Sequence, residues 1–149
     1  MSARPAAIAV AVAVALLVLG CSGKGSSDPK AAFVREATKV CDTSADDIET
    51  ASAQLTPQST AEQVSAFLKQ TLVPLYRKRL DALRALTPPG NDRATISALI
   101  DDQAKVVGAI EADPATYTAL SADPFSAVDA RWDAYGVTSC GSRSALPSS

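Results

Sequence analysis

The stretch Ser59–Leu86 reads STAEQVSAFLKQTLVPLYRKRLDALRAL and predicts a long amphipathic helix. Its apolar residues recur every three or four positions, which places them on one helix face. The stripe consists of Val64, Leu68, Leu72, Leu75, Leu83 and Leu86, widened by Phe67, Tyr76 and Leu80. Ser59 and Glu62 have the spacing of a capping box, which predicts the start of the helix. Because Pro74 cannot donate a hydrogen bond to the carbonyl of Gln70, we expect a kink of more than ~20° there.

Two further long helices are predicted on either side of this stretch. Asp28-Pro29 is typical of a helix start, and the pattern continues to about Gln54 before Thr56-Pro57 ends it. After the break Thr87–Asn91, either Asn91 or Asp92 caps the next helix. The apolar face of the helix that starts at Asp28-Pro29 consists of Phe33, Ala37, Val40, Cys41, Ile48, Ala51 and Leu55. The apolar face of the helix after the break consists of Ile96, Leu99, Ile100, Val106, Val107 and Ile110.

The remaining segment predicts shorter helices. Asp113-Pro114 and Asp123-Pro124 repeat the helix-start signal. Behind the second, Phe125, Val128, Trp132 and Tyr135 form one stripe that buries the only tryptophan, and Gly136 is a good C-cap. No segment alternates apolar and polar residues as a strand does. We therefore expect an all-α fold, a small bundle of three main helices plus a shorter C-terminal helix over residues 29–140, followed by a loose polar tail over 141–149.

Residues 1–20 carry the features of an export signal. Arg4 is the only charged side chain among them, and Ala6–Leu19 is an unbroken apolar run. The run is shorter than the ~18 apolar residues that spanning a bilayer requires, and Gly20 and Cys21 end it. A secretory signal peptide is therefore favoured over a transmembrane helix.

The end of this run, Val18-Leu19-Gly20-Cys21, resembles the lipobox of bacterial lipoproteins. The resemblance implies cleavage between Gly20 and Cys21 and attachment of diacylglycerol to the Cys21 thiol. Two or more acyl chains give stable anchoring where a single chain does not. The implied location is the extracytoplasmic face of the cell membrane, with residues 21–28 as a flexible tether. The alternative is an ordinary signal peptide in which Cys21 has no special role.

With Cys21 assigned to lipid, Cys41 and Cys140 remain as a pair. In an oxidising compartment an even number of cysteines predicts a disulfide, here one that cross-links the whole domain. The alternatives are two free thiols or a redox pair. Redox pairs normally have Cys-x-x-Cys spacing, which these residues lack.

A second resemblance covers nearly all of the mature chain. The early helical cysteine, the break from Leu83 to Pro89 and the ending Tyr135–Gly141 resemble small exported lipoproteins of actinobacteria. The shared motifs are structural, so this resemblance implies a compartment and no activity.

Composition restricts the function further. The residues after position 20 include 13 basic and all 16 acidic side chains, a net charge of −3, without the basic stripe typical of nucleic-acid binding. The chain has no histidine, which argues against Ser-His triads and removes the commonest metal ligand. We therefore expect no enzyme, metal or cofactor.

Three groups of residues are candidate sites. Asp42, Asp46 and Glu49, with Asp47 beside them, form an acidic line that would suit a divalent cation or a basic partner. The favoured interpretation is a solvated face paired with Arg77, Arg79 or Arg84. Arg77-Lys78-Arg79 would suit lipid phosphates but is expected to be a set of surface charges. Tyr76, Trp132 and Tyr135 would suit a ligand pocket but are expected to be core.

The sequence thus predicts an anchored binding or interaction module of the cell envelope, with an envelope protein or a small ligand as partner. The alternatives are an accessory subunit of a membrane complex and, less favoured, a hydrolase that uses carboxylates alone. An apolar pocket between helices would support the binding module, and two close carboxylates in a cleft would support the hydrolase.

Overall fold

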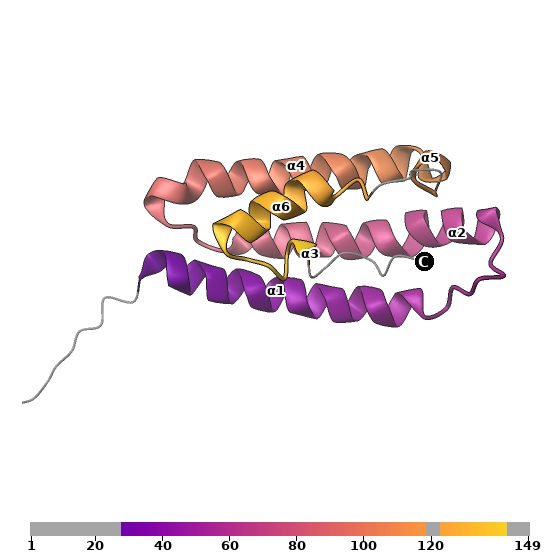
Figure 1. Cartoon of the computed structure of the whole chain (residues 1–149), viewed down its shortest axis with the longest axis horizontal. Helices are drawn as coiled ribbons and strands as arrows, with labels where there is room; N and C mark the ends of the chain where they lie inside the picture. The colour runs from indigo at the N-terminus through magenta and orange to yellow at the C-terminus, as the bar shows by residue number, and fades with distance from the viewer. Residues whose placement is uncertain (1–27, 119–122, 143–149) are drawn as a thin grey trace, which may run out of the picture.

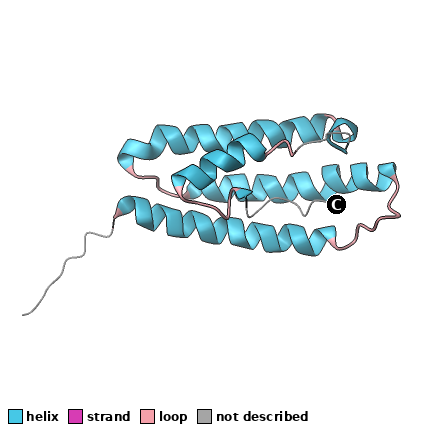
Figure 2. Ribbon diagram, in the orientation of Figure 1, coloured by secondary structure: helices cyan, strands magenta, loops and turns pink. Residues whose placement is uncertain are grey.

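The computed structural model describes residues 28–118 and 123–142, all of whose regular structure is helical. Three long helical segments lie side by side along the molecule (Figure 1; Figure 2). They are α1 (Pro29–Ser52), a composite segment of α2 (Ala61–Phe67), a π-helix (Leu68–Leu72) and α3 (Val73–Ala85), and α4 (Arg93–Ala112). A 3-10 turn (Gly90–Asp92), α5 (Pro114–Thr118) and α6 (Ser126–Tyr135) complete the described elements.

The long segments form an up-and-down bundle with α3 in the middle. In Figure 1, α3 lies between α1 and α4, and α6 crosses in front of α3 and α4. The predicted all-α bundle of three main helices and a shorter C-terminal helix is therefore confirmed. None of the described helices combines the length and apolar character needed to span a bilayer.

A single apolar core lies between these helices. Trp132, the only tryptophan, is fully covered, as the stripe on α6 predicted. Tyr76 stacks on Phe125 with ring centroids 4.8 Å apart, which joins α3 to the start of α6. The largest fully buried apolar side chains are Trp132, Leu72, Leu80, Leu83, Ile96, Leu99, Val107 and Val137.

The disulfide predicted from the cysteine count is present. Cys140, just after α6, is joined to Cys41 in α1, with the two Cα atoms 5.1 Å apart and both residues fully buried. The Cys140 sulfur also lies 3.7 Å from the carbonyl oxygen of Ala37. The C-terminal part of the described chain is thereby held against the middle of α1.

The helix starts differ from the prediction in detail. The capping box consists of Thr60 and Gln63, one residue later than predicted. The backbone N–H of Gln63 donates to Thr60 Oγ1, and the backbone N–H of Thr60 donates to the side-chain Oε1 of Gln63. The Ser59 hydroxyl instead accepts from the Thr56 amide at 2.9 Å and closes the preceding turn. Asp92 occupies the N-cap position of α4, as one of the two residues predicted there, but its side chain makes no capping hydrogen bond, and its carboxylate accepts from the Tyr135 hydroxyl at 2.7 Å.

The kink angle expected at Pro74 stays a prediction, but a π-helical segment, Leu68–Leu72, ends two residues before the proline. The Val73 amide donates to the carbonyl of Leu68, five residues back. A wide turn of this kind accommodates a residue that lacks an amide hydrogen without ending the helix.

Substitution by alanine at two glycines should have opposite effects on the free energy of unfolding. Gly136 ends α6 with φ 107°, and an added Cβ would meet only Val34 at 4.0 Å, so any strain lies in the backbone. Gly136→Ala should lower the free energy of unfolding by about 1–2 kcal/mol. Gly108, inside α4, has nothing within 4 Å of an added Cβ. Gly108→Ala should therefore raise the free energy of unfolding by about 0.4–1 kcal/mol. Urea unfolding followed by circular dichroism checks both, and equal effects would contradict this assignment.

Candidate functional site

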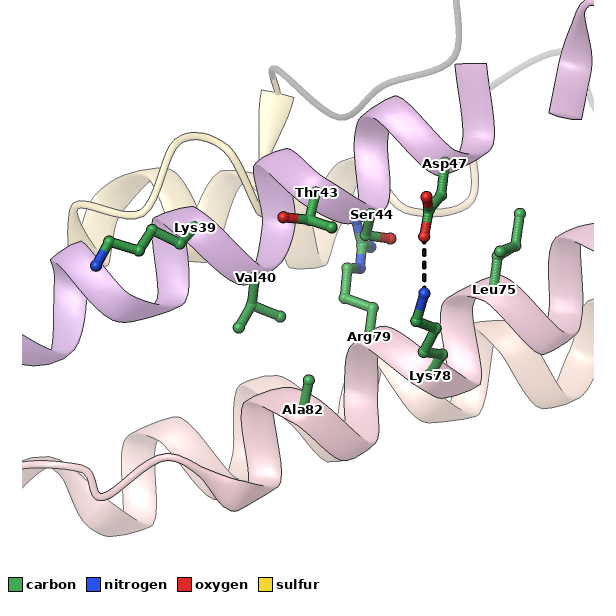
Figure 3. Close-up of a pocket in the computed structure, with 9 residues that line it drawn as sticks. All are labelled: Lys39, Val40, Thr43, Ser44, Asp47, Leu75, Lys78, Arg79 and Ala82. Atoms are coloured by element: carbon green, nitrogen blue, oxygen red, sulfur yellow. Dashed lines mark hydrogen bonds and ion pairs between the residues drawn. The ribbon is translucent and has the colours of Figure 1, made fainter. Parts of the chain in front are cut away.

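A cavity of about 260 Å³ lies between α1 and α3 and is called the α1–α3 pocket. Both helices contribute to it, as Figure 3 shows. Its lining consists of Lys39, Val40, Thr43, Ser44 and Asp47 from α1 and Leu75, Lys78, Arg79 and Ala82 from α3. Val40, Leu75 and Ala82 make the wall largely apolar, while the charged side chains come from both helices. An apolar pocket with a few polar groups is the usual form of a small-molecule site.

Arg79 is the unusual member of this lining. Its side chain is only 2% exposed and reaches from α3 toward α1 (Figure 3). The guanidinium carbon lies 4.4 Å from the centre of the Tyr76 ring, a cation–π contact. Among the described residues, neither its Nε nor its Nη1 has a hydrogen-bond partner, and no carboxylate forms an ion pair with it. Burial lowers the pKa of Arg79, opposed by its contacts with Tyr76 and Asp129.

Ser44 provides a second unpaired group in the same pocket. Its hydroxyl is buried in α1 and has no hydrogen-bond partner among the described residues. The other buried side chains with an unpaired polar atom, outside this pocket, are Ser52, Gln103, Trp132 and Ser139. Within the described part of the chain, the α1–α3 pocket therefore brings together a buried cation without an ion pair and a buried hydroxyl without a hydrogen-bond partner.

The expectation that Arg77-Lys78-Arg79 is a set of surface charges is wrong for Arg79 and holds for its neighbours. Arg77 forms an ion pair with Glu111, and Lys78 Nζ lies 2.9 Å from Asp47 Oδ2; both basic side chains are exposed. Arg79 is buried because it follows Leu72 and Tyr76 on the apolar face and precedes Leu83 there, at helical spacing. That spacing was the signal in the sequence that could have identified it.

The acidic line on α1 lies at the surface, as the favoured interpretation expected, but its ion pairing differs from the expected one. Asp47 pairs with Lys78, and none of Asp42, Asp46 or Glu49 forms an ion pair with Arg77, Arg79 or Arg84. Within residues 28–118 and 123–142, no three potential ligand side chains are grouped so that they could hold a metal ion. The predicted solvated face is present, but the predicted partners Arg77, Arg79 and Arg84 are wrong, and the ion pair found is that of Asp47 with Lys78.

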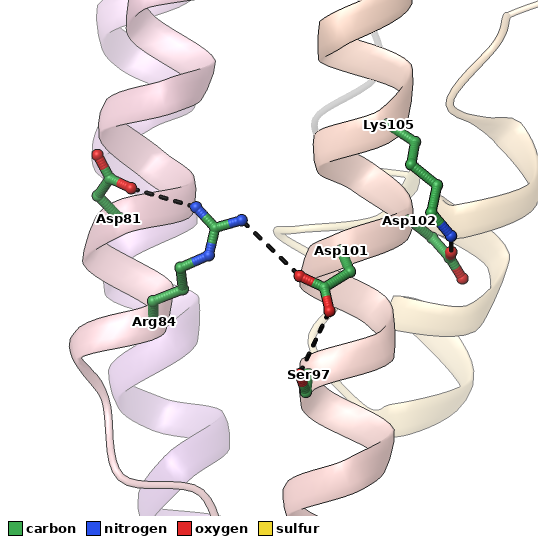
Figure 4. Close-up of polar contacts among 6 residues, drawn as sticks. All are labelled: Asp81, Arg84, Ser97, Asp101, Asp102 and Lys105. Carbon is green, nitrogen blue, oxygen red and sulfur yellow. Dashed lines mark hydrogen bonds and ion pairs between the residues drawn. The ribbon is translucent and has the colours of Figure 1, made fainter.

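A second cavity, of about 440 Å³, lies between the end of α3 and the start of α4. Leu83, Leu86, Ile96 and Ile100 give it an apolar wall, with Arg84, Arg93 and Asp101 among its polar residues. Arg84 pairs with Asp81 at 3.2 Å and with Asp101 at 3.8 Å (Figure 4). Because Arg84 already has two partners and is about half exposed, this α3–α4 pocket offers a less specific recognition element than the α1–α3 pocket.

Of the aromatic residues considered for a ligand site, Tyr76 and Trp132 belong to the buried core, as expected, and Tyr135 is partly buried against it. Tyr76 packs on Phe125, Trp132 is fully buried, and Tyr135 bonds to Asp92 and meets the Phe33 ring edge-on at 6.0 Å. Cys21 and Gly20, the predicted lipidation and cleavage residues, lie outside the described residues, as do the leader and most of the tether.

Asp129 on α6 is a buried carboxylate near Arg79. It is 6% exposed, and burial raises its pKa to about 6, with smaller contributions from Asp123 and Asp133 and an opposing one from Arg79. The folded chain therefore holds the proton of Asp129 up to a higher pH than the unfolded chain does. Stability supplied by Asp129 is present below pH ~4 and lost as the pH rises through about 6.

This shift predicts a fall in the free energy of unfolding of roughly 1–3 kcal/mol between pH 4.5 and 7. The exposed carboxyls of Glu36, Glu62, Asp102 and Asp113, whose pKa values are lowered mainly by hydrogen bonds, act oppositely and only below this window. Urea unfolding at each pH measures the slope, and Asp129→Asn should flatten it. An unchanged slope in that variant would contradict the assignment.

No family model, curated protein or solved structure matches this chain.

Proposed function

We propose that this chain is a lipid-anchored binding module on the extracytoplasmic face of a bacterial cell membrane, and that it holds a small ligand in the α1–α3 pocket. The observation that carries the proposal is this pocket, because it has an apolar wall and contains the Ser44 hydroxyl and the Nε and Nη1 of Arg79, buried atoms that lack hydrogen-bond partners among the described residues. Buried polar groups are normally hydrogen-bonded, so a ligand that supplies their partners would be stabilised there.

Two features support the location. The predicted lipobox ending at Cys21 supports a lipid anchor. The buried disulfide between Cys41 and Cys140 supports an oxidising compartment, since such bonds are rare in the cytosol.

Replacing the leader tests the anchor. In the variant, residues 1–20 are exchanged for an ordinary cleavable export signal and Cys21 is changed to Ala, so export is retained and lipid attachment is not. The native chain should sediment with membranes and the variant should be soluble outside them, as measured by fractionation and immunoblot. A variant that still sediments with membranes would contradict a lipid anchor at Cys21.

Filling the pocket tests the binding function. Ala82 lines the pocket from α3, so the indole of Ala82→Trp should occupy it. Native mass spectrometry of the protein purified from its own membranes should show a bound small molecule that is absent from Ala82→Trp. A matched control is Ala98→Trp on α4, where the side chain is exposed and outside the pocket. The same adduct in both variants, or none in the native protein, would contradict the proposal.

A further inference from the structure

We propose that the ligand of the α1–α3 pocket is a small organic carboxylate, and that Arg79 recognises its charge. This inference rests on the proposed function, because it names the chemical class that the same pocket would bind. It is carried by the contrast between Arg79 and the other cations that line the pocket, and by the apolar character of the remaining wall.

The other two cations of the pocket already have partners. Lys39 Nζ lies 3.2 Å from Glu36 Oε1, and Lys78 Nζ lies 2.9 Å from Asp47 Oδ2. Arg79 is thus the one cation of this lining without an ion pair among the described residues. A buried charge without a partner costs free energy that an anion beside it would offset.

Asp129 is not the anion that pairs with Arg79. It acts on Arg79 electrostatically but forms no ion pair with it. The Arg79 guanidinium contacts the ring of Tyr76, and its Nε and Nη1 have no hydrogen-bond partner among the described residues.

The anion that fits is a carboxylate with an apolar body. One unpaired guanidinium balances one negative charge, whereas a phosphate dianion would bring a second charge into an otherwise apolar cavity. Val40, Leu75 and Ala82 offer contacts to hydrocarbon, and Ser44 offers a hydroxyl to the carboxylate. At about 260 Å³ the cavity is just below the ~300–1,000 Å³ of drug-sized sites, which favours a short chain.

Binding requires a small change in the lining. The unpaired atoms of Arg79 and Ser44 are covered by neighbouring atoms. A rotamer change of either side chain would expose them to the cavity that both residues line. Changes of this kind are common when ligands and partners bind.

Nuclear magnetic resonance titration tests the class of ligand. The protein is the chain from residue 21 with Cys21→Ala, which keeps every described residue. The probes are hexanoate, the neutral hexanamide of equal length, and inorganic phosphate. We expect hexanoate to shift the amide signals of Val40, Thr43, Ser44 and Ala82. Hexanamide should bind about 10-fold or more weakly, as expected without a charge-assisted hydrogen bond, and phosphate should leave these signals unchanged.

Two substitutions of Arg79 separate recognition from folding. Arg79→Met should remove the preference for hexanoate over hexanamide while preserving the circular dichroism spectrum, because apolar side chains commonly replace buried ions without loss of stability. Arg79→Lys keeps the charge and should retain part of the preference even if Arg79→Met does not fold. Arg84→Met is the matched control, an exposed arginine on the same helix that lies outside this pocket, and should bind as the native chain does.

The outcomes distinguish the two proposals. Equal binding of hexanoate and hexanamide at these amides would overturn the carboxylate inference and leave the binding pocket standing. Binding of phosphate, or a preference for hexanoate that survives in Arg79→Met, would also overturn it. If neither organic probe shifts these amides, both the inference and the assignment of the ligand to this pocket are overturned.

Discussion

Reduction of the disulfide between Cys41 and Cys140 should lower the free energy of unfolding by about 2–5 kcal/mol. The bond joins residues 99 positions apart, so it restricts most of the unfolded chain. The chain-entropy model gives ~4.7 kcal/mol for a loop of ~100 residues, which is the upper end of what we expect. Urea unfolding of the oxidised and the reduced protein measures the difference directly.

The control for this experiment is the Cys41→Ala, Cys140→Ala double variant. Both residues are fully buried, so alanine avoids placing an unpaired hydroxyl in the core. The reductant should have no effect on this variant. If the reduced native chain were as stable as the oxidised one, the cross-link would not be a major source of stability.

Trp132→Ala should cost about 3–5 kcal/mol, because Trp132 is the largest fully buried side chain and alanine would leave a cavity in the core. Trp132 lies on α6, which packs against α4, so its loss weakens the attachment of the C-terminal helix to the bundle. Unfolding is followed by far-ultraviolet circular dichroism, since the substitution removes the only tryptophan.

Arg131 provides the matched control for Trp132. It precedes Trp132 on the same helix, with its side chain exposed and paired to Asp102. Exposed ion pairs contribute little, so Arg131→Ala should change stability by less than ~1 kcal/mol. Similar losses in the two variants would mean that Trp132 does not hold the core together as we infer.

The bundle could be predicted because helical periodicity and proline breaks are local properties of the sequence. The stripe around Trp132 and the C-cap at Gly136 are confirmed, and so is the pairing of Cys41 with Cys140. The helix starts were less predictable because Ser59 and Thr60 both suit a cap, and a contact within the turn decides between them.

The candidate site was less predictable than the fold. Arg79 stands in a basic triplet, and composition alone places all three side chains at the surface. Its helical spacing with Tyr76 and Leu83 indicates burial instead, and in the structure Arg79 is buried on that apolar face of α3. Asp92 is a similar case, because its expected capping role is replaced by a bond to Tyr135, 43 positions away.

The central claim is that this helical module is exported and anchored by lipid at Cys21. The most direct test is the intact mass of the protein extracted from membranes, together with sequencing of its N-terminus by mass spectrometry. We predict a chain that begins at Cys21 and carries the mass of diacylglycerol on that residue. A chain that retains residues 1–20, or begins at an unmodified Cys21, would contradict the account.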